Sequence, residues 1–183
     1  MTAFDEMHRF VPYDLAPIRD HYAAYAQWLR QQTPQDLQSL REEAELIFRR
    51  VGITFAVYGD KDEDGTGGER LIPFDLLPRV IPVAEWDRLQ AGLAQRVTAL
   101  NRFLHDVYHE QAILKAGIIP SEQVLGNAQF RQQMIGVSVP NGVYSHISGI
   151  DVVRATHGEE EGQYFVLEDN LRVPSGVSYM LEN

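Results

Sequence analysis

Three residues in the last part of the chain have the side chains and the spacing of a magnesium site. Asp151 lies in the stretch GIDVVR, and Glu168 and Asn170 lie two positions apart in YFVLEDN. Alternate residues of a strand share a face, so Glu168 and Asn170 are expected to point the same way. Carboxylate and amide oxygens are hard ligands, which suit Mg²⁺ when waters and substrate phosphates complete its coordination. The alternative is that these three predicted ligands are ordinary polar residues in water at a strand end.

A β-hairpin would bring the predicted ligands together. Two apolar runs rich in β-branched and aromatic residues flank the polar loop ATHGEEEG, residues 155–162. With that loop, Arg154 pairs with Gln163 and Asp151 lies opposite Val166. This register puts all three predicted ligands on one face, at one end of the hairpin and within diagonal reach of one another.

Two other stretches have the beginnings of a metal site. Asp60–Gly65 starts like a calcium loop, but Leu71 stands where a bidentate glutamate is needed, so an acidic turn in water is favoured. His105 and His109 have the spacing of a helical zinc pair, yet Asp106 replaces the expected glutamate and no third ligand follows. Two ordinary helix histidines are the favoured interpretation, and a zinc protein remains a weaker hypothesis.

Periodicity predicts the elements that must position these residues. The longest helical pattern begins at Trp86 and ends near Gly117, with a break around His105. A second helix is predicted between Thr33, a good capping residue, and Gly52, a good stop.

The remaining segments complete the predicted fold. Residues 53–58 predict a short strand, and residues 59–70 a loop. Residues 71–82 carry three prolines, so they predict an extended or irregular apolar segment. We expect an α/β fold with a mixed β-sheet flanked by helices, in a single domain over 1–183. Residues 1–35 could form a helical N-terminal extension.

The overall composition excludes several classes of protein. The net charge of −10 argues against nucleic acid as a partner, because neutralising phosphates requires clustered lysines and arginines. The absence of cysteine excludes disulfides and thiolate chemistry. No Gly-x-Ser-x-Gly motif is present, so a serine hydrolase is not supported. No run approaches about 18 apolar residues, so we expect neither secretion nor membrane spanning. We expect a cytoplasmic protein.

Four stretches of the sequence together carry a resemblance to a known family. They are ERLIPFDLLPRVIP, ALNRFLHDVYHEQAIL, GIDVVR and YFVLEDNLRVPSGVSYMLEN. They closely resemble the N-terminal part of the circularly permuted ATP-grasp proteins, a bacterial family similar to glutathionylspermidine synthase. The resemblance runs from about residue 40 to the last residue, and the final motif is its most specific part.

The resemblance implies an ATP-dependent carboxylate–amine ligase that works through an acyl phosphate, with Mg²⁺ and ATP as cofactors. Its substrates would be a small-molecule or peptide carboxylate and an amine. The family pattern assigns the metal to the three predicted ligands. It makes Arg172 and Ser175 candidate catalytic residues, and it makes Arg172, Ser175 and Gly176 candidate contacts for the cofactor phosphates.

Two features limit what carries over from the family. The arginine that glutathionylspermidine synthase carries two residues before its metal-binding aspartate is Gly149 here, so its polyamine and glutathione specificity does not transfer. Only thirteen residues follow Asn170, too few for a nucleotide lobe. We therefore expect the N-terminal portion of a larger enzyme, inactive by itself. The alternative function is a non-catalytic module that binds a peptide or a protein.

Overall fold

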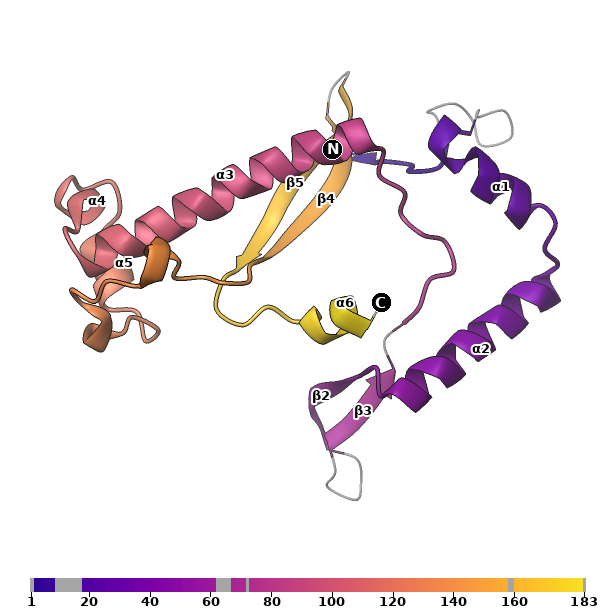
Figure 1. Ribbon diagram of the computed structural model, residues 1–183, viewed down its shortest axis with the longest axis horizontal. Coiled ribbons are helices and arrows are strands. Elements are labelled where there is room, and N and C mark those ends of the chain that lie inside the picture. The colour runs from indigo at the N-terminus through magenta and orange to yellow at the C-terminus, as the bar shows by residue number, and fades with distance from the viewer. Residues whose placement is uncertain (1, 9–17, 62–66, 72, 158–159, 183) are drawn as a thin grey trace. The chain divides into compact units, whose positions relative to one another are not determined.

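The computed structural model describes residues 2–8, 18–61, 67–71, 73–157 and 160–182 (Figure 1). These divide into two units. The hairpin unit comprises Met1–Phe4 and Val83–Val177, and it carries all three predicted ligands. The helical unit comprises Asp5–Pro82 and Ser178–Asn183.

The helical unit consists of helices and one small sheet. Its elements are the 3-10 helix η1 (Asp20–Tyr22), α1 (Ala23–Leu29), α2 (Pro34–Val51), β2 (Thr54–Lys61) and β3 (Gly67–Leu71). β2 and β3 pair antiparallel.

Helix α2 begins and ends where its sequence predicts. The Thr33 hydroxyl accepts a hydrogen bond from the Asp36 N–H at 3.2 Å, while the Asp36 carboxylate accepts one from the Thr33 N–H at 2.8 Å. The Thr33 hydroxyl also donates a hydrogen bond to this carboxylate. The two bonds that the carboxylate accepts, chiefly the one from the hydroxyl, hold the pKa of Asp36 below its usual value. Gly52 ends the helix with a φ of 79°, a left-handed conformation that glycine adopts without strain.

The segment after α2 differs in part from its prediction. The predicted strand over 53–58 is present but continues to Lys61, and Gly67–Leu71 forms a second strand where a loop was expected. Backbone pairing with β2 therefore outweighs the glycine-rich composition of β3. The central part of the calcium-like stretch lies outside the described residues. The prolines of residues 73–82 leave this segment without helix or strand, as predicted.

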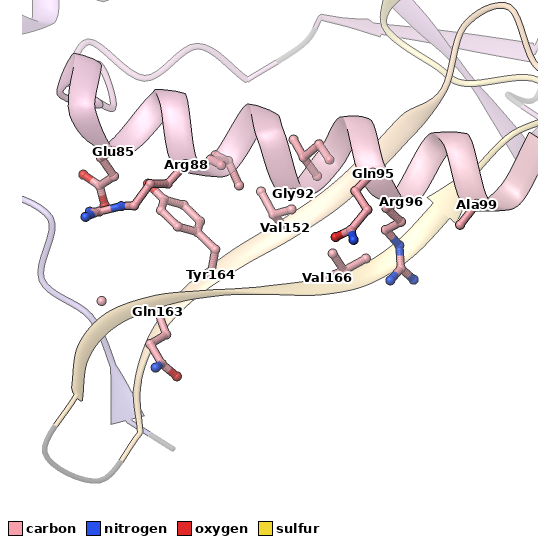
Figure 2. A pocket seen from close by; sticks show the side chains of 13 residues that line it. Glu85, Arg88, Gly92, Gln95, Arg96, Ala99, Val152, Gln163, Tyr164 and Val166 are labelled. Carbon is pink, nitrogen blue, oxygen red and sulfur yellow. The ribbon is translucent and has the colours of Figure 1, made fainter.

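The hairpin unit is built on one long helix and one hairpin. Its elements are β1 (Thr2–Ala3), α3 (Val83–Tyr108), α4 (Ala112–Lys115), α5 (Ser121–Leu125), η2 (Gln132–Met134), η3 (Pro140–Gly142), β4 (Gly149–His157) and β5 (Glu160–Asn170). Helix α6 (Val177–Glu182) begins at the last residue of this unit, and its other residues are assigned to the helical unit. Its sheet has the order β1-β4-β5. α3 lies along one face of the β4–β5 hairpin (Figures 1 and 2).

The break in the long helical pattern comes three residues later than predicted. α3 ends at Tyr108 rather than near His105, because the Asp106 carboxylate accepts hydrogen bonds from the N–H groups of Ala112 and Ile113, at 2.9 and 3.0 Å. These bonds, with Ile113 contributing most, lower the pKa of Asp106. They turn the chain into α4, which ends close to the predicted stop at Gly117.

The fold class is confirmed. Helices combine with small sheets. Each pairing among the described strands is antiparallel, whereas the sequence predicted a mixed sheet. The core of the hairpin unit gathers at the C-terminal end of α3, where Val107 is 2% exposed and Tyr108 stacks on Phe130 at a centroid distance of 5.0 Å. Within the part of the chain that the structure describes, no helix has both the length and the apolar character needed to cross a membrane.

Candidate functional site

The β4–β5 register brings the predicted ligands together. Asp151 is the direct cross-strand partner of Glu168, and Gly149 is the partner of Asn170. Directly opposed residues of an antiparallel pair project from the same face, with Cβ atoms about 4.5–5.5 Å apart. The two carboxylates are therefore nearest neighbours, and Asn170 is the next residue of β5 on that face.

The register near the turn differs from the predicted one. Arg154 pairs with Tyr164 rather than with Gln163. The reason is that the strands extend further than the polar composition suggests, to His157 on one side and back to Glu160 on the other. Most of the predicted eight-residue loop is therefore strand, and its pairing shifts the register by one residue.

A β-bulge shifts the register again beside the predicted ligands. Val152 pairs with Val166, whereas the preceding residue, Asp151, pairs with Glu168, so Leu167 is the extra residue of β5. An extra residue inverts the alternation of faces along its strand. Val152 and Val166 consequently face α3, as Figure 2 shows, whereas Asp151 and Glu168 project from the other face. The predicted pairing of Asp151 with Val166 is wrong.

Asp169, between the predicted ligands in sequence, points toward α3 and binds an arginine there. The Arg96 guanidinium donates from Nε to Oδ1 of Asp169 at 2.7 Å and from Nη2 to Oδ2 at 2.6 Å. These two hydrogen bonds are the main cause that lowers the pKa of Asp169. Sequence reasoning missed Arg96. The signal was an arginine three residues after Leu93, in the otherwise apolar stripe of α3.

A second ion pair joins α3 to the hairpin near its turn. Glu85 Oε1 lies 2.5 Å from Arg154 Nη2, and the two side chains are only 13% and 10% exposed. The Arg154 Nε donates to the Gly162 carbonyl at 3.0 Å, and its guanidinium lies over the Phe4 ring at 4.0 Å. Gly162 has a φ of 68°, and a Cβ there would come within 2.7 Å of Arg154 Nε. Glycine is therefore required at this position.

An open groove lies between the two ion pairs. It has a volume of about 920 Å³ and is bounded by α3 on one side and the hairpin on the other (Figure 2). Its lining includes Leu89 and Gly92 of α3, and Val152 and Val166 of the hairpin. The two ion pairs join α3 to the hairpin at the two ends of this groove.

A hydrogen-bond chain connects α3 to the residue that follows Asn170. The side-chain oxygen of Asn101 accepts from the N–H groups of Tyr144 and Ser145, at 2.7 and 3.0 Å. The Ser145 hydroxyl, 7% exposed, lies 3.0 Å from the Leu171 carbonyl, to which it can donate. The end of β5 is thus anchored on both sides of Asn170, by Arg96 through Asp169 and by Asn101 through Ser145.

The candidate phosphate-binding residues follow β5 directly. Arg172 and Ser175 are exposed, so their side chains are accessible to a ligand. Gly176 has a φ of 82° and makes the turn into α6. Among the described residues, no interaction joins the side chain of Arg172 or Ser175 to the predicted ligands.

Gly149 allows this turn to approach the start of β4. A Cβ at position 149 would lie 3.0 Å from the Pro174 Cβ and 3.4 Å from the Asn170 Cβ. A larger side chain would have to displace Pro174. The glycine is therefore part of the local packing around Asn170.

The two histidines of the predicted zinc pair, His105 and His109, contact each other. The rings of His105 and His109 stack at a centroid distance of 4.1 Å, and the His109 Nδ1 lies 2.9 Å from the His105 carbonyl oxygen. Asp106 binds the amides of α4, as described above. In the ranges that the structure describes, no group of three or more His, Cys, Asp or Glu is arranged to hold a metal.

The predicted ligands differ from such a group because they comprise two carboxylates and one amide. Asp151 and Glu168 are exposed and Asn170 is half-buried, so a cation has access to all three. Two opposed carboxylates attract a dication and repel each other without one, although water screens this repulsion at an exposed site. The donor set fits a hard dication such as Mg²⁺ that keeps coordination positions for water or phosphate.

Comparisons with known proteins cover this site. A family model described as a circularly permuted ATP-grasp matches residues 78–183, a range that includes α3, the hairpin and the turn after it. An uncharacterized protein of Synechocystis sp. is 45% identical over 165 residues, which are 90% of this chain and 33% of that protein. An uncharacterized protein of Mycobacterium tuberculosis is 41% identical over 184 residues, 99% of this chain and 30% of that protein.

A further relative has a name that denotes an enzyme. A Frankia casuarinae protein named "Putative glutamate--cysteine ligase 2-2" is 38% identical over 165 residues, which are 90% of this chain and 18% of that protein. The chain thus spans a third or less of the length of each of these relatives.

Proposed function

Because the chain belongs to the circularly permuted ATP-grasp family, we propose that it supplies the magnesium-binding residues and part of the substrate site of an ATP-dependent carboxylate–amine ligase. The observation that carries this proposal is the cross-strand pair of Asp151 and Glu168, with Asn170 next on the same face. The ligase name of the Frankia relative supports the reaction class. Since the chain covers a third or less of its relatives, the complete reaction is proposed for a protein of their length.

The proposed reaction has two steps. The substrate carboxylate attacks the γ-phosphorus of ATP, which forms an acyl phosphate and releases ADP. The amine nitrogen then attacks the acyl carbon, so that an amide bond forms, phosphate leaves and the nitrogen loses a proton. Bound Mg²⁺ would neutralise the negative charge of the phosphate oxygens. The reaction consumes ATP, which favours a cytoplasmic setting.

The residues of this chain have distinct roles in the proposal. Asp151, Glu168 and Asn170 hold the cation on the exposed face of the hairpin. Arg172 binds the transferred phosphate or the substrate carboxylate, because a guanidinium recognises both with paired hydrogen bonds. The N–H groups of the turn at Ser175 and Gly176 would donate hydrogen bonds to an oxyanion.

Loss of a single carboxylate tests the proposal. We expect Asp151→Asn and Glu168→Gln each to lower kcat for amide formation by about 100-fold or more, since a bound metal contributes several kcal/mol to the stabilisation of transition-state charge. ADP release and amide formation would be measured in a protein of the relatives' length, with Mg²⁺, ATP, and mixtures of carboxylates and amines.

Asp87→Asn is the matched control. Asp87 is an exposed carboxylate of α3, where it accepts a hydrogen bond from Gln90, so its loss should leave activity unchanged. Full activity in Asp151→Asn would contradict the assignment. A protein whose properties change neither with ATP and Mg²⁺ nor with the loss of these carboxylates would favour the non-catalytic binding module.

A further inference from the structure

The Arg96–Asp169 ion pair lies on the opposite face of β5 from the predicted ligands. We propose that Arg96 is a positioning residue of the cation site. By binding Asp169 to α3, it holds the end of β5 in the bulged register, in which Glu168 faces the same way as Asp151. This inference rests on the proposed function, because it assigns Arg96 a role only through the ligands of that site.

The register next to the ligands has a close competitor. If the pairing of Val152 with Val166 simply continued without the bulge, Asp151 would lie opposite Leu167 and Ile150 opposite Glu168. A slip of one residue moves each side chain of a strand to the other face. Glu168 would then point toward α3, and the two carboxylates of the site would be on opposite faces of the hairpin.

Two anchors in α3 hold the bulged register. The first is the paired hydrogen bond of Arg96 to Asp169, at 2.7 and 2.6 Å. The second is the chain from Asn101 through Ser145 to the Leu171 carbonyl. A slip would move Asp169 off the α3 face and replace it by Glu168, whose side chain is one methylene longer. Arg96 forms both hydrogen bonds with Asp169, which has the shorter side chain. In this register Glu168 faces the same way as Asp151.

Charge and geometry predict opposite effects of removing Arg96. Arg96 is positive and therefore cannot attract a cation, so if charge alone mattered, Arg96→Gln would strengthen cation binding. If Arg96 acts by holding the register, Arg96→Gln weakens binding instead. Arg96→Lys further separates the effect of charge from the effect of geometry, because lysine keeps the charge but lacks the planar guanidinium that makes two parallel hydrogen bonds.

The test measures Mn²⁺ binding to the 183-residue chain by electron paramagnetic resonance, with Mn²⁺ standing in for Mg²⁺. We expect Arg96→Gln and Arg96→Lys each to weaken Mn²⁺ binding by about 10-fold, the lower end of the effect of losing a group that orients metal ligands. Arg88→Gln removes the same charge from another groove-lining position of α3 and should bind Mn²⁺ as the wild type does. Amide hydrogen exchange should accelerate at residues 168–170 in both Arg96 variants and not in Arg88→Gln.

The outcomes separate this inference from the proposed function. Unchanged or tighter Mn²⁺ binding in Arg96→Gln, with Asp151→Asn and Glu168→Gln both impaired, would overturn the role of Arg96 alone. If Asp151→Asn and Glu168→Gln bind Mn²⁺ like the wild type, the cation site itself is wrong, while hydrogen exchange still reports whether Arg96 holds the register. If Arg96→Gln does not fold, as judged by circular dichroism, Arg96→Lys decides.

Discussion

The two ion pairs that join α3 to the hairpin differ in how far they are exposed. Near the turn, the side chains of Arg154 and Glu85 are 10% and 13% exposed. At the open end, those of Arg96 and Asp169 are 44% and 18% exposed. A buried ion that loses its partner stays without hydration, whereas an exposed one is solvated by water. The difference in exposure therefore predicts that the turn end contributes more to folding stability, and it leaves the open end for the proposed positioning role.

This division suits a cation site. Ligands must be accessible to water and substrate, and Asp151 and Glu168 are exposed on the outer face of the hairpin. A site of this kind cannot be stabilised by burying its own charges, so its geometry has to be fixed from the opposite face. The Arg96–Asp169 pair meets that need without burying the charges of the site.

The largest effect is expected from breaking the buried pair. Glu85→Gln keeps the size of the side chain but removes the negative charge that faces the buried Arg154 guanidinium, so it should lower the free energy of unfolding by about 3–5 kcal/mol. Urea unfolding followed by circular dichroism measures this. The double variant Glu85→Leu with Arg154→Met removes both charges and should cost less than the single change. A loss in Glu85→Gln no larger than that of an exposed substitution would contradict the assignment of stability to the turn end.

A smaller effect is expected at the second anchor of the open end. Asn101→Ala deprives the N–H groups of Tyr144 and Ser145 of their common acceptor, and an unsatisfied buried donor costs about 1–3 kcal/mol. Thr98→Ala is the control, because the Thr98 hydroxyl donates to the Ala94 carbonyl of its own helix. Urea unfolding of the two variants compares them directly. Equal stabilities would show that the hydrogen-bond chain through Ser145 contributes little.

The sequence predicts the elements whose causes are local. The start of α2 follows from Thr33 and Asp36, three residues apart, and its end from Gly52, so short-range chemistry determines both. The hairpin itself follows from two β-rich runs and a polar turn. The break in α3 was misplaced because it depends on Asp106 reaching amides six and seven residues further on, which periodicity does not report.

The shared face of Asp151 and Glu168 was predicted from a register that is wrong. The turn shifts the pairing by one residue and the bulge at Leu167 shifts it by one more. Because side chains alternate with a period of two, a total shift of two residues preserves the face. Arg96 was missed for a different reason: its partner, Asp169, lies 73 positions away, and no local pattern connects them.

The smallest effect on stability is expected at the exposed pair, and salt distinguishes it from the buried one. Arg96→Gln should lower the melting temperature far less than Glu85→Gln does. Raising NaCl to about 1 M, where the screening length is about 3 Å, should reduce the difference between Arg96→Gln and the wild type. The effect of Glu85→Gln should persist in the same salt, because a buried pair is little screened. Thermal unfolding of the wild type and both variants at low and high salt measures these differences. If Arg96→Gln destabilised the chain as much as Glu85→Gln, the open end would also be needed for folding, and weaker cation binding in that variant would no longer distinguish positioning from loss of structure.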